Sequence, residues 1–239
     1  MRVRRINEGV WMKGSLITVI IPAYNAEKYL GEAIESVLAQ TDFKLDVVVV
    51  NDGSIDNTAK VIKHFGSSVR YFDQANAGAG AARNLGITNA YGDYFAFLDA
   101  DDLWMEEKIR RQWTAFENDP HLDAAFGYIR QFYSPELTPE EKNRINIPFE
   151  IMPGHHAGTM LIKKKSFLRV GLFKNELRIG EFIDWHARAT ESNLKTIMLP
   201  DVLMKRRIHV TNMGTYLRDQ RSGYVHALKA ALDRRRAKA

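Results

Sequence analysis

The chain has 239 residues, of which 45% are hydrophobic and 26% are charged, as in an ordinary globular domain. It contains no cysteine, which excludes thiol redox chemistry, a disulfide framework and cysteine-ligated zinc, and favours a cytoplasmic location. The basic start lacks the apolar stretch of a signal peptide, and no run approaches the roughly 18 apolar residues of a membrane span. We therefore expect a soluble protein.

The formal net charge is +5, and five cations against one aspartate in residues 229–239 already contribute +4. Such a tail is typical of a solvated helix end or of weak peripheral contact with an acidic membrane face. It lacks the aromatic residues of a nucleic-acid platform, so no nucleic-acid partner is expected. We expect an N-terminal extension (1–14), one domain (15–212) and a basic C-terminal helix (213–239).

Strand and helix patterns alternate through the first half of the chain. Apolar runs predict strands, and apolar residues at helical spacing predict helices. The predicted strands are 16–21, 45–50, 69–73 and 94–98, and the predicted helices are 26–40, 56–65, 79–89 and 104–118. This alternation predicts an α/β fold with a Rossmann-like, mostly parallel sheet flanked by helices.

The second half is less regular. It shows a strand-like run at 124–131, a polar loop, a helix at 181–192, a short strand at 196–199 and a terminal helix at 220–237. We interpret residues 15–118 as a nucleotide-binding half and residues 119–212 as an acceptor-binding half. The stretch from His155 to Thr159 is expected to border the acceptor site.

Three carboxylates, those of Asp99, Asp101 and Asp102, directly follow the apolar run 94–98. Ligands of open α/β sheets bind outside the carboxyl ends of the strands, and clustered oxygen ligands suit Mg²⁺ or Mn²⁺ bound together with a diphosphate. An acidic residue after a strand can also cap the next helix, but three in four residues favour a metal–nucleotide site.

Polar turns follow the first two predicted strands on the same sheet edge. Tyr24 could pack on a base, Asp52 could accept a hydrogen bond from a base N–H, and Gly53 would allow close backbone approach. Ser54 and Asp56 could instead be helix caps.

A turn of small residues, 76–82, opens the third helix and is followed by Arg83, so helix amides and a cation would favour a diphosphate. Gly78 and Gly80 are spaced as in a dinucleotide-binding fingerprint. The position of the third glycine is Arg83, however, and the turn belongs to the third βα unit, which excludes that interpretation.

Taken in this order, the runs 22–25, 51–58, 76–84 and 98–102 resemble the motifs of the GT-A glycosyltransferases of family two. The resemblance covers about residues 15–212 and implies a nucleotide-sugar donor, a divalent cation (Mn²⁺ or Mg²⁺) and transfer with inversion. It implies that Asp52 contacts the base, Asp99 the ribose or the metal, and Asp101 the metal. The expected donor-binding residues are Pro22, Tyr24, Asn25, Asp52, Gly53, Asn76, Gly78, Arg83, Asp99, Ala100 and Arg207.

Two motifs of the family lie further along the chain. Its Glu-Asp pair, which supplies the general base, is Glu181 followed by Phe182 here, so the base could be Glu181 or Asp184, with Asp184 slightly favoured. Asp184 could instead form only an ion pair with Arg188. The Arg-x-His motif is Arg207-Ile208-His209, and it implies His209 as a metal ligand beside Asp99 and Asp101, or as a diphosphate contact.

The expected activity is transfer of a sugar, by preference from a UDP-sugar, to a hydroxyl of a carbohydrate, lipid-linked or peptide acceptor. Two alternatives are a nucleotidyltransferase or pyrophosphorylase, and an inactive nucleotide-sugar-binding module. The first normally has a Gly-rich basic loop after its first strand, where this chain has Pro22-Ala23-Tyr24-Asn25. The inactive binding module is credible because Phe182 stands where the family usually has an aspartate.

Overall fold

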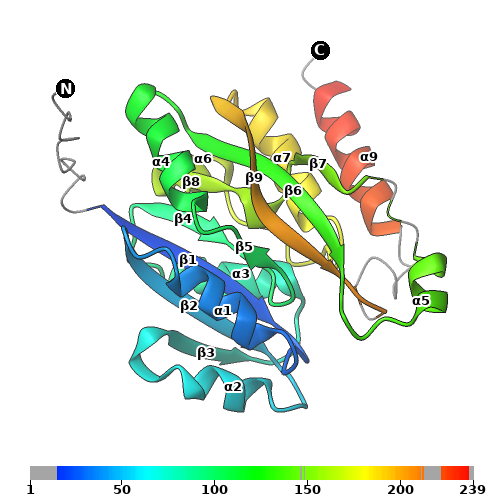
Figure 1. Cartoon of the computed structure of the whole chain (residues 1–239). Coiled ribbons are helices and arrows are strands. Elements are labelled where there is room, and N and C mark those ends of the chain that lie inside the picture. Colours follow the sequence, from blue (N-terminus) through cyan, green and yellow to red (C-terminus); the bar gives the residue numbers. More distant parts are fainter. Residues whose placement is uncertain (1–14, 146, 148, 211, 213–221, 237–239) are drawn as a thin grey trace, which may run out of the picture.

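The computed structural model describes residues 15–145, 147, 149–210, 212 and 222–236. The expected N-terminal extension and parts of the expected C-terminal segment lie outside these residues. Nine strands form one sheet with the order β3-β2-β1-β4-β8-β6-β9-β5, and β7 pairs with β6 at the side (Figure 1). The strands are β1 (Leu16–Ala23), β2 (Lys44–Asp52), β3 (Arg70–Gln74), β4 (Tyr94–Phe97), β5 (Leu103–Trp104), β6 (Ala124–Tyr133), β7 (Ile151–Gly154), β8 (Leu161–Lys163) and β9 (Thr196–Ile208).

The helices of the described chain cover both faces of this sheet (Figure 1). Residues of α1, α2 and α4 pack on one face, and residues of α3, α6 and α7 pack on the other. The α-helices are α1 (Leu30–Leu38), α2 (Thr58–His64), α3 (Ala79–Thr88), α4 (Lys108–Asn118), α5 (Pro139–Arg144), α6 (Lys164–Val170), α7 (Glu181–Glu191) and α9 (Ser222–Arg236). Short 3₁₀ turns occur at Gly66–Ser68 and Ala157–Thr159.

The expected α/β fold is confirmed, and the sheet is parallel where the sequence alternates most regularly. β1 runs parallel to both β2 and β4, and β2 runs parallel to β3. β8 is antiparallel to its neighbours β4 and β6, so the whole sheet is mixed. Because β1, β2 and β4 point the same way, the polar segments after them meet at one edge.

The strand expected at 196–199 is longer than predicted, because β9 continues to Ile208 beside β6. Pro200 lies where the pairing register shifts, and a proline in a strand is tolerated at such an irregularity. This extension carries Arg207 back to the segment that holds the three carboxylates, since the backbone N–H of Arg207 donates to Asp102 Oδ1 at 2.9 Å.

At the other end of the chain, α9 packs beside α7 (Figure 1). Arg234 of α9 donates to Glu191 Oε2 at 2.9 Å and to Asp184 Oδ1 at 3.0 Å. The described part of the chain has no helix of the length and apolar character that crossing a bilayer needs.

Candidate active site at the carboxyl edge of the sheet

The loops after β1 and β2 are joined by hydrogen bonds. Asn25 has a left-handed backbone (φ 46°), its N–H donates to Ser54 Oγ at 2.9 Å, and its Oδ1 accepts from the N–H of Ile55 at 2.9 Å. Tyr24 beside it is 51% exposed, whereas Pro22 is buried in β1. Tyr24 is therefore open to a ligand at this edge.

Asp52 is buried and organises the loop that precedes α3. Its carboxylate accepts from the backbone N–H groups of Ala77 and Gly78, each at 2.8 Å, and from Gln74 Nε2 at 2.7 Å. The loop comes so close that a Cβ on Gly53, whose φ is +72°, would lie 2.7 Å from the backbone nitrogen of Asn76. A direct contact between Asp52 and a base stays a prediction.

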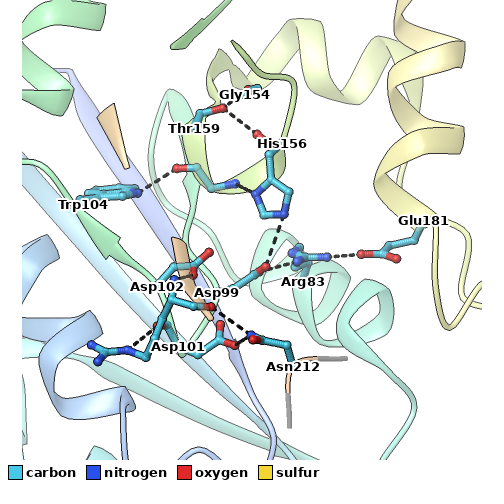
Figure 2. Close-up of polar contacts among 12 residues, drawn as sticks. Arg83, Asp99, Asp101, Asp102, Trp104, Gly154, His156, Thr159, Glu181 and Asn212 are labelled. Atoms are coloured by element: carbon cyan, nitrogen blue, oxygen red, sulfur yellow. Dashed lines mark hydrogen bonds and ion pairs between the residues drawn. The ribbon is translucent and has the colours of Figure 1, made fainter. Parts of the chain in front are cut away.

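Arg83, on the first turns of α3, bridges two carboxylates. Its Nη2 lies 2.6 Å from Asp99 Oδ1 and its Nη1 lies 2.6 Å from Glu181 Oε1 (Figure 2). Burial would lower the pKa of the guanidinium, but the charges of Asp99 and Glu181 outweigh burial and raise it. The structure thus brings Arg83 to Asp99, the expected ribose or metal contact, and to Glu181, one of the two candidate bases, and its contact with a diphosphate stays a prediction.

Asp99 lies between Arg83 and His156, which belongs to the stretch expected to border the acceptor site and was not among the expected metal or donor ligands. Nε2 of His156 is 3.7 Å from Asp99 Oδ2, and the Asp99 side chain is 29% exposed (Figure 2). Partial burial raises the pKa of the Asp99 carboxyl, but the charges of Arg83 and His156 outweigh it and lower that pKa. Burial lowers the pKa of His156 itself.

Asp101 faces the end of β9. Its Oδ2 lies 3.0 Å from Nε2 of His209, so the structure brings together two of the expected metal ligands. The same oxygen lies 3.2 Å from Nδ2 of Asn212 (Figure 2). Asn212 also fixes the backbone, because its Oδ1 accepts from the N–H of His209 at 2.5 Å. An asparagine three residues after the histidine carries no motif that would have identified it.

Arg207 has a different environment from the one expected of a donor-binding residue. Its guanidinium carbon lies 4.8 Å from the ring centroids of both Tyr29 and Phe132, and Nη2 is 2.7 Å from Glu32 Oε2. Nε donates to the carbonyl of Asp101 at 3.1 Å. Arg207 therefore fixes the backbone beside the carboxylates, and a contact with the donor stays a prediction.

Asp102 is the third carboxylate of the run, and it is buried. Burial and the charges of Asp101 and Asp99 raise its pKa well above the ordinary value, and its Oδ1 accepts from Arg207 N. Asp102 ties the carboxylate segment to β9, while Ala100 between the two site aspartates is buried.

The two candidate bases lie in different surroundings. Glu181 starts α7 and joins Arg83, whereas the Asp184 side chain is fully buried against Arg188 (2.8 Å), Arg234 (3.0 Å) and Lys174 (3.2 Å). Burial raises the pKa of Asp184, but the hydrogen bonds and charges of Arg188 and Lys174 outweigh it and lower that pKa. This position does not support the slight preference for Asp184, because a buried carboxylate held by three cations is not open to an acceptor, and the identity of the base stays a prediction.

Phe182, which replaces the family's usual aspartate, packs into the core. Its ring centroid lies 6.0 Å from that of Trp185 and 6.2 Å from that of His156, and the residue is 7% exposed. The position is apolar here, which leaves Glu181 as the acidic residue of the motif beside the other carboxylates.

The donor atoms at this edge fit a divalent cation that is bound together with a diphosphate. No group of three histidine or acidic side chains is arranged as a complete metal site in the described ranges. Mg²⁺ is usually held by one or two carboxylates plus substrate phosphates, so a complete protein cage is not required. Asp99, Asp101 and His209 offer oxygen and imidazole donors of the kind that Mg²⁺ and Mn²⁺ accept.

Comparison with known proteins identifies the family. The model of Glycosyl transferase family 2 matches residues 18–174. The chain is 34% identical over 206 residues to an uncharacterized glycosyltransferase of Rickettsia typhi, covering 81% of this chain and 64% of that relative. An uncharacterized glycosyltransferase of Rickettsia felis is 35% identical over 175 residues, and this match covers 68% of this chain and 29% of that relative. The chain thus spans less than two thirds of the length of these curated relatives.

Solved structures show the same GT-A fold. The mannosyltransferase PcManGT of Pyrobaculum calidifontis, in complex with GDP-Man and Mn²⁺, has a TM-score of 0.69 and 19% identity over 91% of this chain and 64% of its own. S. aureus TarS 1-349, in complex with UDP-GlcNAc, has a TM-score of 0.64 and 22% identity over 81% of this chain and 58% of its own. Since the family model also spans more than half of the sequence, the chain belongs to glycosyl transferase family 2.

Proposed function

We propose that the chain is a glycosyltransferase that moves a sugar from a nucleoside diphosphate sugar, by preference a UDP-sugar, to an acceptor hydroxyl with inversion. The observation that carries this proposal is the Arg83 bridge, which holds Asp99 and Glu181 on one guanidinium at the carboxyl edge of the sheet. The complexes of the two structural neighbours with UDP-GlcNAc and with GDP-Man and Mn²⁺ support it.

Glu181 is the general base in this proposal. Arg83 binds its Oε1, and Oε2 makes no hydrogen bond to the described residues, so Oε2 is the atom that would take the acceptor proton. The acceptor oxygen then bonds to the anomeric carbon as the bond from that carbon to the diphosphate breaks, which inverts the configuration. The diphosphate leaves with the bonding electron pair.

Asp99, Asp101 and His209 would hold Mn²⁺ or Mg²⁺. When bound, the cation would neutralise the charge that develops on the departing diphosphate. Tyr24 would pack against the base, and the loop held by Asp52 would lie beside the ribose and the base. Asn25, Gly53, Asn76 and Gly78 shape these loops.

The acceptor in this proposal is a carbohydrate, a lipid-linked sugar or a peptide, and the enzyme is cytoplasmic. Arg234 is already bound to Glu191 and Asp184, so a weak contact with an acidic membrane face would depend on the other cations of the tail. Vesicle sedimentation with and without anionic lipid would test this contact.

The test of the activity is release of nucleoside diphosphate from a panel of nucleotide sugars with Mn²⁺. Glu181→Gln should lower kcat by about 10²- to 10⁴-fold with little change in donor affinity, as expected for loss of a general base. Glu191→Gln is the matched control, because Glu191 lies on the same helix as Glu181 but forms its ion pair with Arg234 of α9. Donor binding without turnover would favour the inactive module, and pyrophosphate release from a nucleoside triphosphate would favour a nucleotidyltransferase.

A further inference from the structure

The loop between β7 and β8 presents His156 to the carboxylates in one orientation. The N–H of Gly158 donates to Nδ1 of His156 at 3.1 Å, and Thr159 Oγ1 donates to the carbonyls of His156 (3.0 Å) and Gly154 (Figure 2). The imidazole is therefore anchored to its own loop by one ring nitrogen.

This anchor determines which nitrogen carries the proton. A backbone N–H is a donor only, so Nδ1 of His156 must be the acceptor, and the neutral ring carries its hydrogen on Nε2. Nε2 lies 3.7 Å from Oδ2 of Asp99, whereas Oδ1 of the same carboxylate is bound by Arg83. Arg83 thus donates a hydrogen bond to one oxygen of Asp99, and the Nε2–H of His156 faces the other oxygen at a distance longer than a hydrogen bond.

Three residues of β5 and α4 brace the loop from behind. Trp104 Nε1 donates to the carbonyl of Gly158 at 2.9 Å, and Gln112 Nε2 donates to the carbonyl of Thr159 at 2.6 Å. The fully buried Lys108 donates to Gln112 Oε1 at 2.8 Å and lies 4.1 Å from the ring centroid of Trp104. Because Lys108 occupies Oε1, the amide NH₂ of Gln112 is directed at the loop.

The loop has little room to move. A Cβ on Gly158 would lie 2.3 Å from Sδ of Met204, so the backbone here packs directly against β9. A loop that cannot shift keeps the imidazole of His156 in a fixed position, and a fixed partner is needed to orient a proposed metal ligand such as Asp99.

We propose that His156 is a positioning residue for Asp99: the braced loop directs its Nε2–H at Oδ2, and with Arg83 on Oδ1 it fixes the carboxylate in the orientation that meets the donor. This inference rests on the proposed function only for the identity of the ligand that Asp99 binds. The contact between His156 and Asp99 can be tested without any substrate.

The first test is nitrogen-15 NMR of the imidazole rings in the full chain, with His156 assigned by His156→Gln. We expect the Nε2-protonated tautomer, and a change in the Nε2 resonance in Asp99→Asn but not in Asp101→Asn, which alters the carboxylate beside His209. An Nδ1-protonated tautomer would overturn the proposal, and so would an Nε2 resonance that is unchanged in Asp99→Asn.

The second test is calorimetry of UDP binding in the presence of Mn²⁺. His156→Ala should weaken binding by about 10- to 100-fold, as when a partner of a metal ligand is removed, and His156→Gln should recover most of it through its amide N–H. His155→Ala is the matched control, because its ring faces Phe126 (5.5 Å) and His186 (5.0 Å). Equal binding by wild type and His156→Ala would refute the proposal. If the wild type binds no nucleotide, the proposed function fails, and the NMR result still decides the role of His156.

Discussion

Asp99 and Glu181 are held by the two terminal nitrogens of one guanidinium, that of Arg83, each at 2.6 Å. The two carboxylates come from distant parts of the sequence, one after β4 and one at the start of α7. Arg83 therefore sets the separation between the proposed metal ligand and the proposed base.

The first prediction concerns this bridge. A lysine at position 83 keeps the charge but lacks the planar fork that binds two carboxylates at once. Arg83→Lys should lower kcat/KM for the nucleotide sugar by about 10- to 100-fold, a typical effect of losing a partner of a metal ligand. Steady-state release of nucleoside diphosphate measures this.

Arg188→Lys is its control. Arg188, which is partly buried where Arg83 is buried, is also bound to a carboxylate, but it joins Asp184 and the carbonyls of Val170 and Leu172. We expect this variant to lose stability and to keep its kinetics once folded. Equal kinetic losses in both variants would contradict the special role of the bridge.

The second prediction assigns Asp184 to stability. Breaking a buried ion pair by removing one partner costs about 3 kcal/mol or more, so Asp184→Asn should lower the free energy of unfolding while leaving kcat nearly unchanged. Because the folded-state pKa of Asp184 is lowered, its stabilisation is complete above the unfolded-state pKa of about 3.9 and is lost as the pH falls through the folded-state value.

Urea unfolding of wild type and Asp184→Asn from pH 7 down to pH 3 checks this. The difference in free energy between the two proteins should be constant above about pH 5 and shrink below pH 4. A difference independent of pH, or a large loss of kcat, would mean that Asp184 acts in another way.

The third prediction concerns the buried Lys108. Burial lowers its pKa well below the ordinary value, so the unfolded chain holds a proton that the folded chain lacks until the pH approaches about 10.4. The stability of the wild type should therefore rise relative to Lys108→Met between pH 7 and pH 10. Parallel stability curves for the two proteins over this range would show that Lys108 is charged when folded.

The fourth prediction concerns the nucleotide base. If Asp52 accepts the N3–H of uracil in addition to its bonds from Gln74, Ala77 and Gly78, UDP should compete with the donor better than ADP, whose base has no such N–H. Competition binding of UDP and ADP measures the preference, and Asp52→Asn should reduce it. Equal inhibition by both nucleotides would mean that Asp52 does not recognise the base and only stabilises the loop whose N–H groups, those of Ala77 and Gly78, it binds.

The sheet edge that holds the candidate site could be predicted from sequence because its parts lie in regular βα units. Buried runs and helical spacing place β1, β2 and β4, and polar turns directly follow them. β8 and α6 were missed, since a strand of three residues and a helix of seven give no clear periodicity. β9 was cut short by Pro200 because the compensating register shift depends on β6.

The partners of Asp184 and His156 could not be predicted in the same way. Spacing on one helix shows Arg188 near Asp184, but Lys174 and Arg234 reach it only through tertiary packing. His156 likewise meets Asp99 because β8 pairs with β4, and that pairing was not predicted. Local periodicity carries no information on such contacts.

The most direct test of the account is calorimetric titration of the full chain with a UDP-sugar, with and without Mn²⁺. Asp101→Ala should abolish Mn²⁺-dependent binding while the circular dichroism spectrum stays unchanged. Asp201→Ala should bind like the wild type, because Asp201 has a similar side-chain exposure (34% against 30%) but pairs with Arg111 of α4. Binding by Asp101→Ala that equals that of the wild type in affinity and in metal dependence would contradict the proposed donor site.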